Sequence, residues 1–234
     1  MTEDDYDDRL AIAFVPGVTL TKWTRAWAER RPDVPLTVTE TSETEQVAVL
    51  HDGSAELSFV RLPIDTDGLH VIPLYREVAV AVVSKDHAIA AADFLTLEDL
   101  AGETVRTGSG FGPDDFDLVA AGVGILVVPH SIARLQSRKD LVSRPVTDAA
   151  ETQVALAWRA DSGSDLLASR IEEFVGIVRG RTAHSSRSAP AEEAPAKASA
   201  KPRAAKAKRP APSRGGNFAQ QRKNAAARKK HRPH

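Results

Sequence analysis

Threonine and arginine side chains follow two predicted strands, at positions where they could hold a small organic acid. Thr19 and Thr21 come after a short strand at 9–15, whose larger apolar residues alternate, and they lead into an amphipathic helix. The N–H groups and positive dipole end of such a helix suit a carboxylate. Arg61 follows a second strand, at 55–60, and its planar fork could bind a carboxylate at the same edge of the sheet.

The same residues have ordinary structural explanations, which remain open at the level of sequence. Thr19 or Thr21 could act as the N-cap of the helix, because a threonine hydroxyl accepts a hydrogen bond from an N–H group of the first turn. Arg61 could be a solvated surface arginine, which is the more common role for this residue type.

A glycine-rich segment at 108–112 follows a brief strand at 104–106 and invites comparison with nucleotide-binding loops. It lacks the six-residue glycine spacing of dinucleotide-binding loops, and no Gly-Lys-Ser/Thr follows. We therefore interpret 108–112 as a linker and not as a phosphate-binding loop.

The sequence shows no pattern of an enzyme or of a metal site. It contains no cysteine, so it has no disulfide framework, no thiolate ligand and no thiol nucleophile. His51, His70, His87 and His130 have no metal-ligand spacing, and neither a nucleophile elbow nor a zinc-type His-Glu-x-x-His is present. We expect no enzyme, no cofactor and no bound metal.

The order of predicted elements indicates an α/β fold. Strands alternate with short helices in the first sixty residues, and such crossovers are right-handed and build a parallel sheet. The unbroken apolar run at 78–83 is typical of a strand buried on both faces. The expected strands are 9–15, 36–38, 55–60, 69–73, 77–84, 104–106, 124–128 and 153–158, and the expected helices lie between Thr21 and Pro32, between Ser42 and Gly53, at 96–101, at 114–121 and between Ser164 and Gly180.

The net charge of −1 conceals two oppositely charged parts. Residues 181–234 hold 15 basic and 2 acidic residues, a charge of +13, whereas the remainder holds 16 basic and 30 acidic residues, a charge of −14. The segment 181–234 is rich in Ala, Pro, Lys, Arg and Ser and has little apolar bulk, so we expect it to be disordered. The acidic lead at 1–8 is unlike a secretory signal, no apolar run is long enough to span a membrane, and we expect a cytoplasmic protein.

Seven segments in chain order resemble the effector-binding domain of LysR-type transcriptional regulators, over roughly residues 9–180. They are RLAIAFV at 9–15, RPDVPL at 31–36, VLHDGSAELSF at 49–59, GLHVIPLYRE at 68–77, SKDHAIA at 84–90, LEDL at 97–100 and LVAAGVGILVVP at 118–129. The resemblance implies a type 2 periplasmic-binding-protein-like fold of two lobes, with a small organic-acid or aromatic effector between them. It assigns about 9–76 and 159–180 to lobe I and about 77–158 to lobe II.

The sequence departs from that family in two respects. The winged helix-turn-helix that usually precedes the effector domain is not expected, since the similarity starts at residue 9. The second lobe should be contracted, because the family has several more elements between residues 105 and 119. In this interpretation Thr19, Thr21, Arg61, Thr107 and Ser109 line the cleft, and a homodimer follows by analogy with the family.

The basic segment supports an alternative of a different class, a protein that binds nucleic acid without sequence preference. Its Ala-Lys-Pro blocks resemble histone-like arms, and each phosphate contact would release counterions. A solubilising arm, or one that folds back on the acidic body, would account for the same composition. The residues expected to contact DNA are Lys201, Arg203, Lys206, Lys208, Arg209, Arg222, Lys223, Arg228, Lys229 and Lys230.

Overall fold

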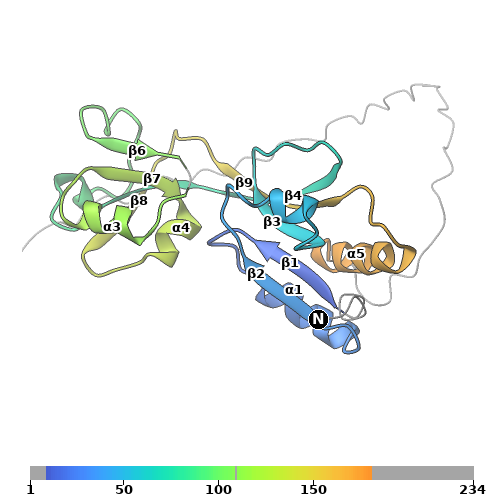
Figure 1. Ribbon diagram of the computed structural model, residues 1–234. Coiled ribbons are helices and arrows are strands. Elements are labelled where there is room, and N and C mark those ends of the chain that lie inside the picture. The colour runs from blue at the N-terminus through green and yellow to red at the C-terminus, as the bar shows by residue number, and fades with distance from the viewer. Residues whose placement is uncertain (1–8, 109, 181–234) are drawn as a thin grey trace, which may run out of the picture. The chain divides into compact units, whose positions relative to one another are not determined.

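The computed structural model describes residues 9–108 and 110–180, which form two sheets in two lobes (Figure 1). The first sheet has the order β2-β1-β3-β9-β4, and the second has the order β6-β7-β5-β8. The elements are β1 (Leu10–Phe14), α1 (Thr21–Arg30), β2 (Leu36–Glu40), α2 (Ala48–His51), β3 (Leu57–Arg61), β4 (Leu69–Glu77), β5 (Ala79–Ser84), η2 (Ala88–Ala91), β6 (Val105–Thr107), α3 (Pro113–Ala120), β7 (Ile125–Pro129), α4 (His130–Leu135), β8 (Leu141–Pro145), β9 (Thr152–Arg159) and α5 (Asp165–Val178).

The first lobe begins with the parallel strands that the alternation of strands and helices predicts. β1 pairs in parallel with β2 and with β3, so Ile12 lies between Val38 and Leu57. An aromatic cluster fills the core on one face, where the Trp23 and Phe59 rings stack at 4.9 Å between centroids and Phe174 meets Phe59 edge-on at 6.3 Å. These contacts hold α1 and α5 against β3, because Trp23 lies on α1 and Phe174 on α5.

The starts of the first and last helices differ in how their N–H groups are satisfied. The predicted cap at Ser164 is confirmed, since its Oγ accepts a hydrogen bond from the Leu167 N–H at 3.2 Å. The predicted cap at Thr19 or Thr21 is wrong, because Leu20 occupies the N-cap position and no side chain caps α1. Thr21 is already the first helical residue, so its hydroxyl does not face the N–H groups of the first turn.

The second lobe forms a four-stranded sheet although the span between β6 and α3 is short. β5 lies at the centre of its sheet and is buried along Ala79–Val83. One face packs against Phe116 and Val119 of α3, and the other against Leu95 and Leu100. The two-lobed α/β fold expected from the resemblance is confirmed, and the contracted lobe keeps a core on both faces of its sheet.

The lobe boundary lies before β9 and not at residue 158. β9 is inserted between β3 and β4 of the first sheet, where Leu156 pairs with both Phe59 and Ile72. Both flanking strands are antiparallel to β9, and its residues Val154–Ala157 are fully buried. The assignment of 153–158 to lobe II is therefore corrected, since hydrogen bonding and burial both place this strand in lobe I.

Further segments differ from the sequence-based expectation, among them the helix expected between Ser42 and Gly53, of which only α2 (Ala48–His51) is helical. The expected helix at 96–101 is a set of turns, in which the Asp99 carboxylate accepts from the Thr96 N–H at 2.8 Å. α4 and β8 were not predicted, since 130–135 is only two turns long and 141–145 does not alternate. Within the described residues, no helix is long and apolar enough to cross a membrane.

Candidate functional site

Arg61 is the centre of a buried ionic network where the two lobes meet. Its guanidinium donates from Nε and Nη2 to the same Oε2 of Glu77, at 3.2 and 3.1 Å, and from Nη1 to Oε1 of Glu43. Nη2 also donates to the Pro16 carbonyl at 3.1 Å and to the Ser131 hydroxyl at 3.4 Å. The Arg61 and Glu77 side chains are 4% and 6% exposed, so this pair is almost removed from water.

The ends of the strands explain why these groups converge. Arg61 is the last residue of β3 and Glu77 the last of β4, while Ser131 lies in the first turn of α4 in the second lobe. The buried side chain of Gln46 holds the backbone of Arg61 on both sides, since its Oε1 accepts from the Arg61 N–H at 2.7 Å and its Nε2 donates to the Arg61 carbonyl at 3.1 Å. Gln46 thus continues the hydrogen bonding of the sheet and fixes the position of the Arg61 backbone.

The environment of Arg61 differs from both sequence-based interpretations. A solvated arginine is excluded by its burial. A free fork that awaits a carboxylate ligand is not what the geometry presents either, because two carboxylates of the chain already accept from it. Sequence reasoning missed Glu43 and Glu77. Glu77 could have been noticed, because it borders the unbroken apolar run at 78–83.

A cavity of about 600 Å³ lies beside this network and extends between the two lobes. Arg61 and Thr107, two of the predicted cleft residues, line it together with Glu43. A smaller pocket of about 170 Å³ shares Glu43 and is lined by Phe111. We call the larger space the Arg61 cavity; its remaining lining residues are Thr44, Gln46, Leu62, Pro63, Ala79, Leu97, Gly108, Val127, Val128, Pro129, Ala149, Ala150 and Thr152.

Thr19 and Thr21 line a different hollow, of about 530 Å³, which also contains Glu77, Ser131 and Arg134. The predicted cleft residues are therefore not gathered in one place, since Arg61 and Thr107 line the Arg61 cavity. The ionic network connects the two spaces, because Glu43 lines the first and Glu77 lines the second.

Two of the remaining sets of predicted residues cannot be located. Ser109 lies outside the described residues, and so do all ten basic residues expected to contact DNA.

Tyr75 lines the Thr19 hollow, where burial and the nearby Glu77 charge raise the pKa of its phenol. In the described ranges 9–108 and 110–180, no three His, Cys, Asp or Glu side chains are placed to share a metal ion.

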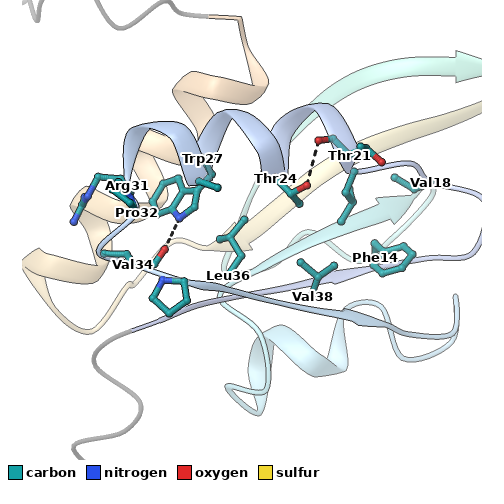
Figure 2. Close-up of a pocket in the computed structure, with 13 residues that line it drawn as sticks. Phe14, Val18, Thr21, Thr24, Trp27, Arg31, Pro32, Val34, Leu36 and Val38 are labelled. Atoms are coloured by element: carbon teal, nitrogen blue, oxygen red, sulfur yellow. Dashed lines mark hydrogen bonds between the residues drawn. The ribbon is translucent and has the colours of Figure 1, made fainter.

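A fourth space is an apolar groove on the first lobe, between α1 and the edge strand β2 (Figure 2). Figure 2 shows Trp27, whose Nε1 donates to the Val34 carbonyl at 2.7 Å, with Leu36 and Val38 further along the groove. Its volume is about 530 Å³, and Arg31 at one end is paired with Asp33 and Glu173. This groove suits an apolar group, and it was not expected from the sequence.

Comparison with protein families and curated sequences agrees with the fold. Residues 4–114 match the family described as LysR substrate binding domain. The probable hydrogen peroxide-inducible genes activator of Mycobacterium avium is 24% identical in an alignment 180 positions long, which covers 64% of this chain and 57% of the relative. The HTH-type transcriptional regulator CatR of Pseudomonas putida is 29% identical in an alignment 162 positions long, which covers 56% of this chain and 55% of the relative. The chain thus spans little more than half the length of these relatives.

This chain also has the fold of solved structures, and it matches two of them over almost their whole length. The BenM effector binding domain with its effector benzoate has a TM-score of 0.59 and 21% identity, over 76% of this chain and 96% of that chain. The reduced form of OxyR has a TM-score of 0.61 and 21% identity, over 75% of this chain and 96% of that chain. At this identity the likeness establishes the fold and leaves the ligand to be argued from the residues.

Proposed function

This chain contains a LysR-type effector-binding domain, and we propose that it is a sensor of a small molecule that takes part in the regulation of transcription. The observation that carries this proposal is the Arg61 cavity, which is bounded by both lobes and lined by hydroxyl and apolar groups. Its volume of about 600 Å³ lies within the range of small-molecule sites. The relatives named as a gene activator and as transcriptional regulators support the regulatory part of the proposal.

We expect that binding of an effector in the cavity changes the position of one lobe relative to the other. Ala79 and Thr152, which line it, stand at the starts of β5 and β9, next to the points where the chain passes from one sheet to the other. A molecule that touches Arg61 of the first lobe and Thr107 of the second would favour one arrangement of the lobes over others. A ligand of this kind also stabilises the folded state by mass action.

Thermal unfolding of the whole chain with a panel of small metabolites tests the proposal. An effector should raise the melting temperature, and Thr107→Val should reduce that gain because it removes a hydroxyl from the cavity. Thr39→Val is the matched control, since Thr39 is exposed on the edge strand β2. If no member of a broad panel stabilises the chain, the role as a sensor is contradicted.

A thiol-based sensing mechanism does not fit this sequence. Three of the solved OxyR structures are named as reduced or oxidised forms, and others as cysteine variants. The 234 residues contain no cysteine, so no thiol in them can be oxidised. Binding of a molecule without covalent chemistry is the mechanism that the residues support.

A second candidate function is binding of DNA without sequence preference through residues 181–234. The charge of +13 in this segment favours it, because phosphate contacts made by Lys and Arg need no defined fold. Cytoplasmic location is part of both proposals, since the relatives regulate genes.

A homodimer is also part of the proposal. β2 is an edge strand of the first sheet, and Val38 on it is 40% exposed beside the apolar groove of Figure 2. An exposed apolar edge strand is a surface that commonly pairs with another chain. Val38→Lys should shift a dimer toward monomer in sedimentation equilibrium, whereas Thr39→Lys on the same strand should have a smaller effect.

A further inference from the structure

The ionic network beside the Arg61 cavity carries an excess of negative charge. Among its lining residues in the described ranges, Glu43 and Arg61 are the charged ones, and in the adjoining small pocket Glu43 is the charged one. The Arg61 charge is already offset by Glu77, which accepts two hydrogen bonds from it in a buried contact. Arg61, Glu43 and Glu77 together therefore carry a net charge of −1 beside the cavity, in surroundings where charges are weakly screened, although Glu77 itself lines the hollow on the other side of the network.

Glu43 keeps one carboxylate oxygen for a ligand. Its Oε1 accepts from Arg61 Nη1, while no donor of the described residues lies on Oε2. The Glu43 side chain is only 15% exposed, and it lines both the Arg61 cavity and the small pocket that contains Phe111. A half-satisfied carboxylate in such a place favours a donor that carries a positive charge, because charge-assisted hydrogen bonds are the strong ones.

Binding of a carboxylate ligand at Arg61 would be unfavourable. To reach the Arg61 fork it would have to displace Glu43 or Glu77, and the displaced glutamate would remain in a nearly dry site without its partner. Removing one partner from a buried ion pair is strongly unfavourable. The remaining polar side chains that line the cavity are Gln46, whose amide is hydrogen-bonded to the backbone of Arg61, and Thr44, Thr107 and Thr152, so the described lining offers no second cation.

We propose that the effector of the Arg61 cavity is a small cation, an amine or amidine, whose N–H groups donate to Glu43. This inference rests on the proposed sensor function and replaces the expected organic acid. The apolar walls provided by Leu62, Val127 and Val128 suit an apolar or aromatic body attached to the charged group.

Three ring compounds of nearly equal shape test the charge preference on the full chain. Benzamidine is cationic, benzamide neutral and benzoate anionic at pH 7.5. Calorimetric titration and thermal unfolding at equal ionic strength should show binding in the order benzamidine, benzamide, benzoate, with benzoate silent in the millimolar range. Putrescine, butanediol and succinate repeat the comparison for aliphatic chains.

Glu43→Gln provides the decisive variant, because it removes the charge and keeps the shape. Benzamidine should bind about tenfold more weakly, the loss expected when one charge-assisted hydrogen bond becomes a neutral one. Benzoate should gain affinity, since Arg61 Nη1 loses its anionic partner. Glu29→Gln is the matched control, because Glu29 is exposed on α1 and lines none of the four spaces described above.

The outcomes separate the inference from the proposed function. Benzoate that binds the unmodified chain as well as benzamidine, or benzamidine that binds Glu43→Gln unchanged, overturns the cation preference and leaves the sensor function standing. If no compound of either set binds, and the broad metabolite panel also fails, both are overturned. If Glu43→Gln does not fold, Glu43→Asp keeps the charge with a shorter reach, and an unchanged benzamidine affinity in that variant contradicts the role of Glu43.

Discussion

Arg61 Nη2 lies 3.4 Å from Ser131 Oγ, so the last residue of β3 in the first lobe reaches the first turn of α4 in the second. The backbone of Gly17 approaches the same serine, and a Cβ atom added to Gly17 would stand 2.6 Å from Ser131 Oγ. The lobes therefore meet here through a glycine and a small hydroxyl residue. A larger group at either position would alter the space on both sides of the ionic network.

Gly17→Ala should disturb this contact. Gly17 has a φ of +87°, which is unfavourable for alanine, and the new methyl would overlap Ser131 at a distance that real Cβ atoms do not show. We expect a loss of about 2–4 kcal/mol in the free energy of unfolding, because backbone strain of about 1–3 kcal/mol is added to a steric clash. Urea unfolding followed by circular dichroism measures it.

Gly53→Ala separates the two contributions to that loss. Gly53 has a φ of +78°, but nothing lies within 4 Å of its added Cβ. Gly53→Ala should therefore lower the free energy of unfolding only by the backbone strain. Adding Ser131→Gly to Gly17→Ala should restore part of the free energy of unfolding that Gly17→Ala loses. Equal losses at positions 17 and 53 would contradict the close approach of Gly17 to Ser131.

Removal of the Arg61 charge should destabilise the fold strongly. Arg61→Met leaves Glu77 buried at 6% exposure without its cation, and the loss of one partner from a buried pair is about 3–5 kcal/mol. Arg61→Met with Glu77→Gln should recover much of this loss, since the unpaired charge is gone. Denaturant unfolding of the two single variants and the double variant gives the coupling between the residues.

The exposed pair of Arg76 and Glu151 is the matched control for that cycle. Its two side chains are 70% and 45% exposed and their charged atoms are 3.5 Å apart, so Arg76→Met should change the free energy of unfolding by about 0–1 kcal/mol. If Arg61→Met lowers the free energy of unfolding no more than Arg76→Met does, the burial of the Arg61 network does not increase its contribution to stability.

Patterns with a regular period allowed most of the fold to be predicted. The buried run at 78–83 and the apolar face of α5 follow from the spacing of apolar residues, which depends on local geometry alone. β9 has the composition of a buried strand in either lobe, and only its pairing with β3 and β4 decides the sheet. Lobe membership is a property of contacts distant in sequence, so it could not be read from the strand itself.

The site was less predictable than the fold, for a related reason. Arg61 was identified because it follows a strand, but its partners come from positions 18 residues before it and 16 after it. No local pattern joins Glu43 to Glu77, since one lies in a turn and the other ends a strand. Thr19 was assigned to the same cleft from its place at a strand end, but it lines a separate hollow.

Glu56 should make stability depend on pH. Burial raises the pKa of its carboxyl, and the hydrogen bond that its Oε2 accepts from the Ala11 N–H at 2.5 Å offsets this in part. Because the folded pKa lies above the unfolded one, the stabilisation is complete below the unfolded pKa, near 4.3, and is lost as pH rises through the folded pKa. Glu56→Gln should therefore raise the melting temperature at pH 7.5 and have little effect near pH 4.

Asp99 is the control of opposite sign for that experiment. Hydrogen bonds from the Thr96 N–H and hydroxyl hold the pKa of Asp99 below its ordinary value, so its stabilisation is present at neutral pH and disappears as pH falls through the folded pKa. Asp99→Asn should lower the melting temperature at pH 7.5 and approach the unmodified chain in acid. If the change in melting temperature caused by each substitution depended on pH in the same direction for Glu56→Gln and Asp99→Asn, the burial of Glu56 would be contradicted.

The basic segment should give the chain an affinity for DNA that falls steeply with salt. Replacement of the ten basic residues expected to contact DNA, from Lys201 to Lys230, by glutamine in the full chain should abolish retardation of arbitrary duplexes in gel shift assays. With about six phosphate contacts, the affinity of the unmodified chain should fall by roughly a thousandfold between 50 and 200 mM salt. Replacement of Lys22, Arg25 and Arg134 in the body is the control, and retardation that depends on these three residues would assign DNA binding to the body instead.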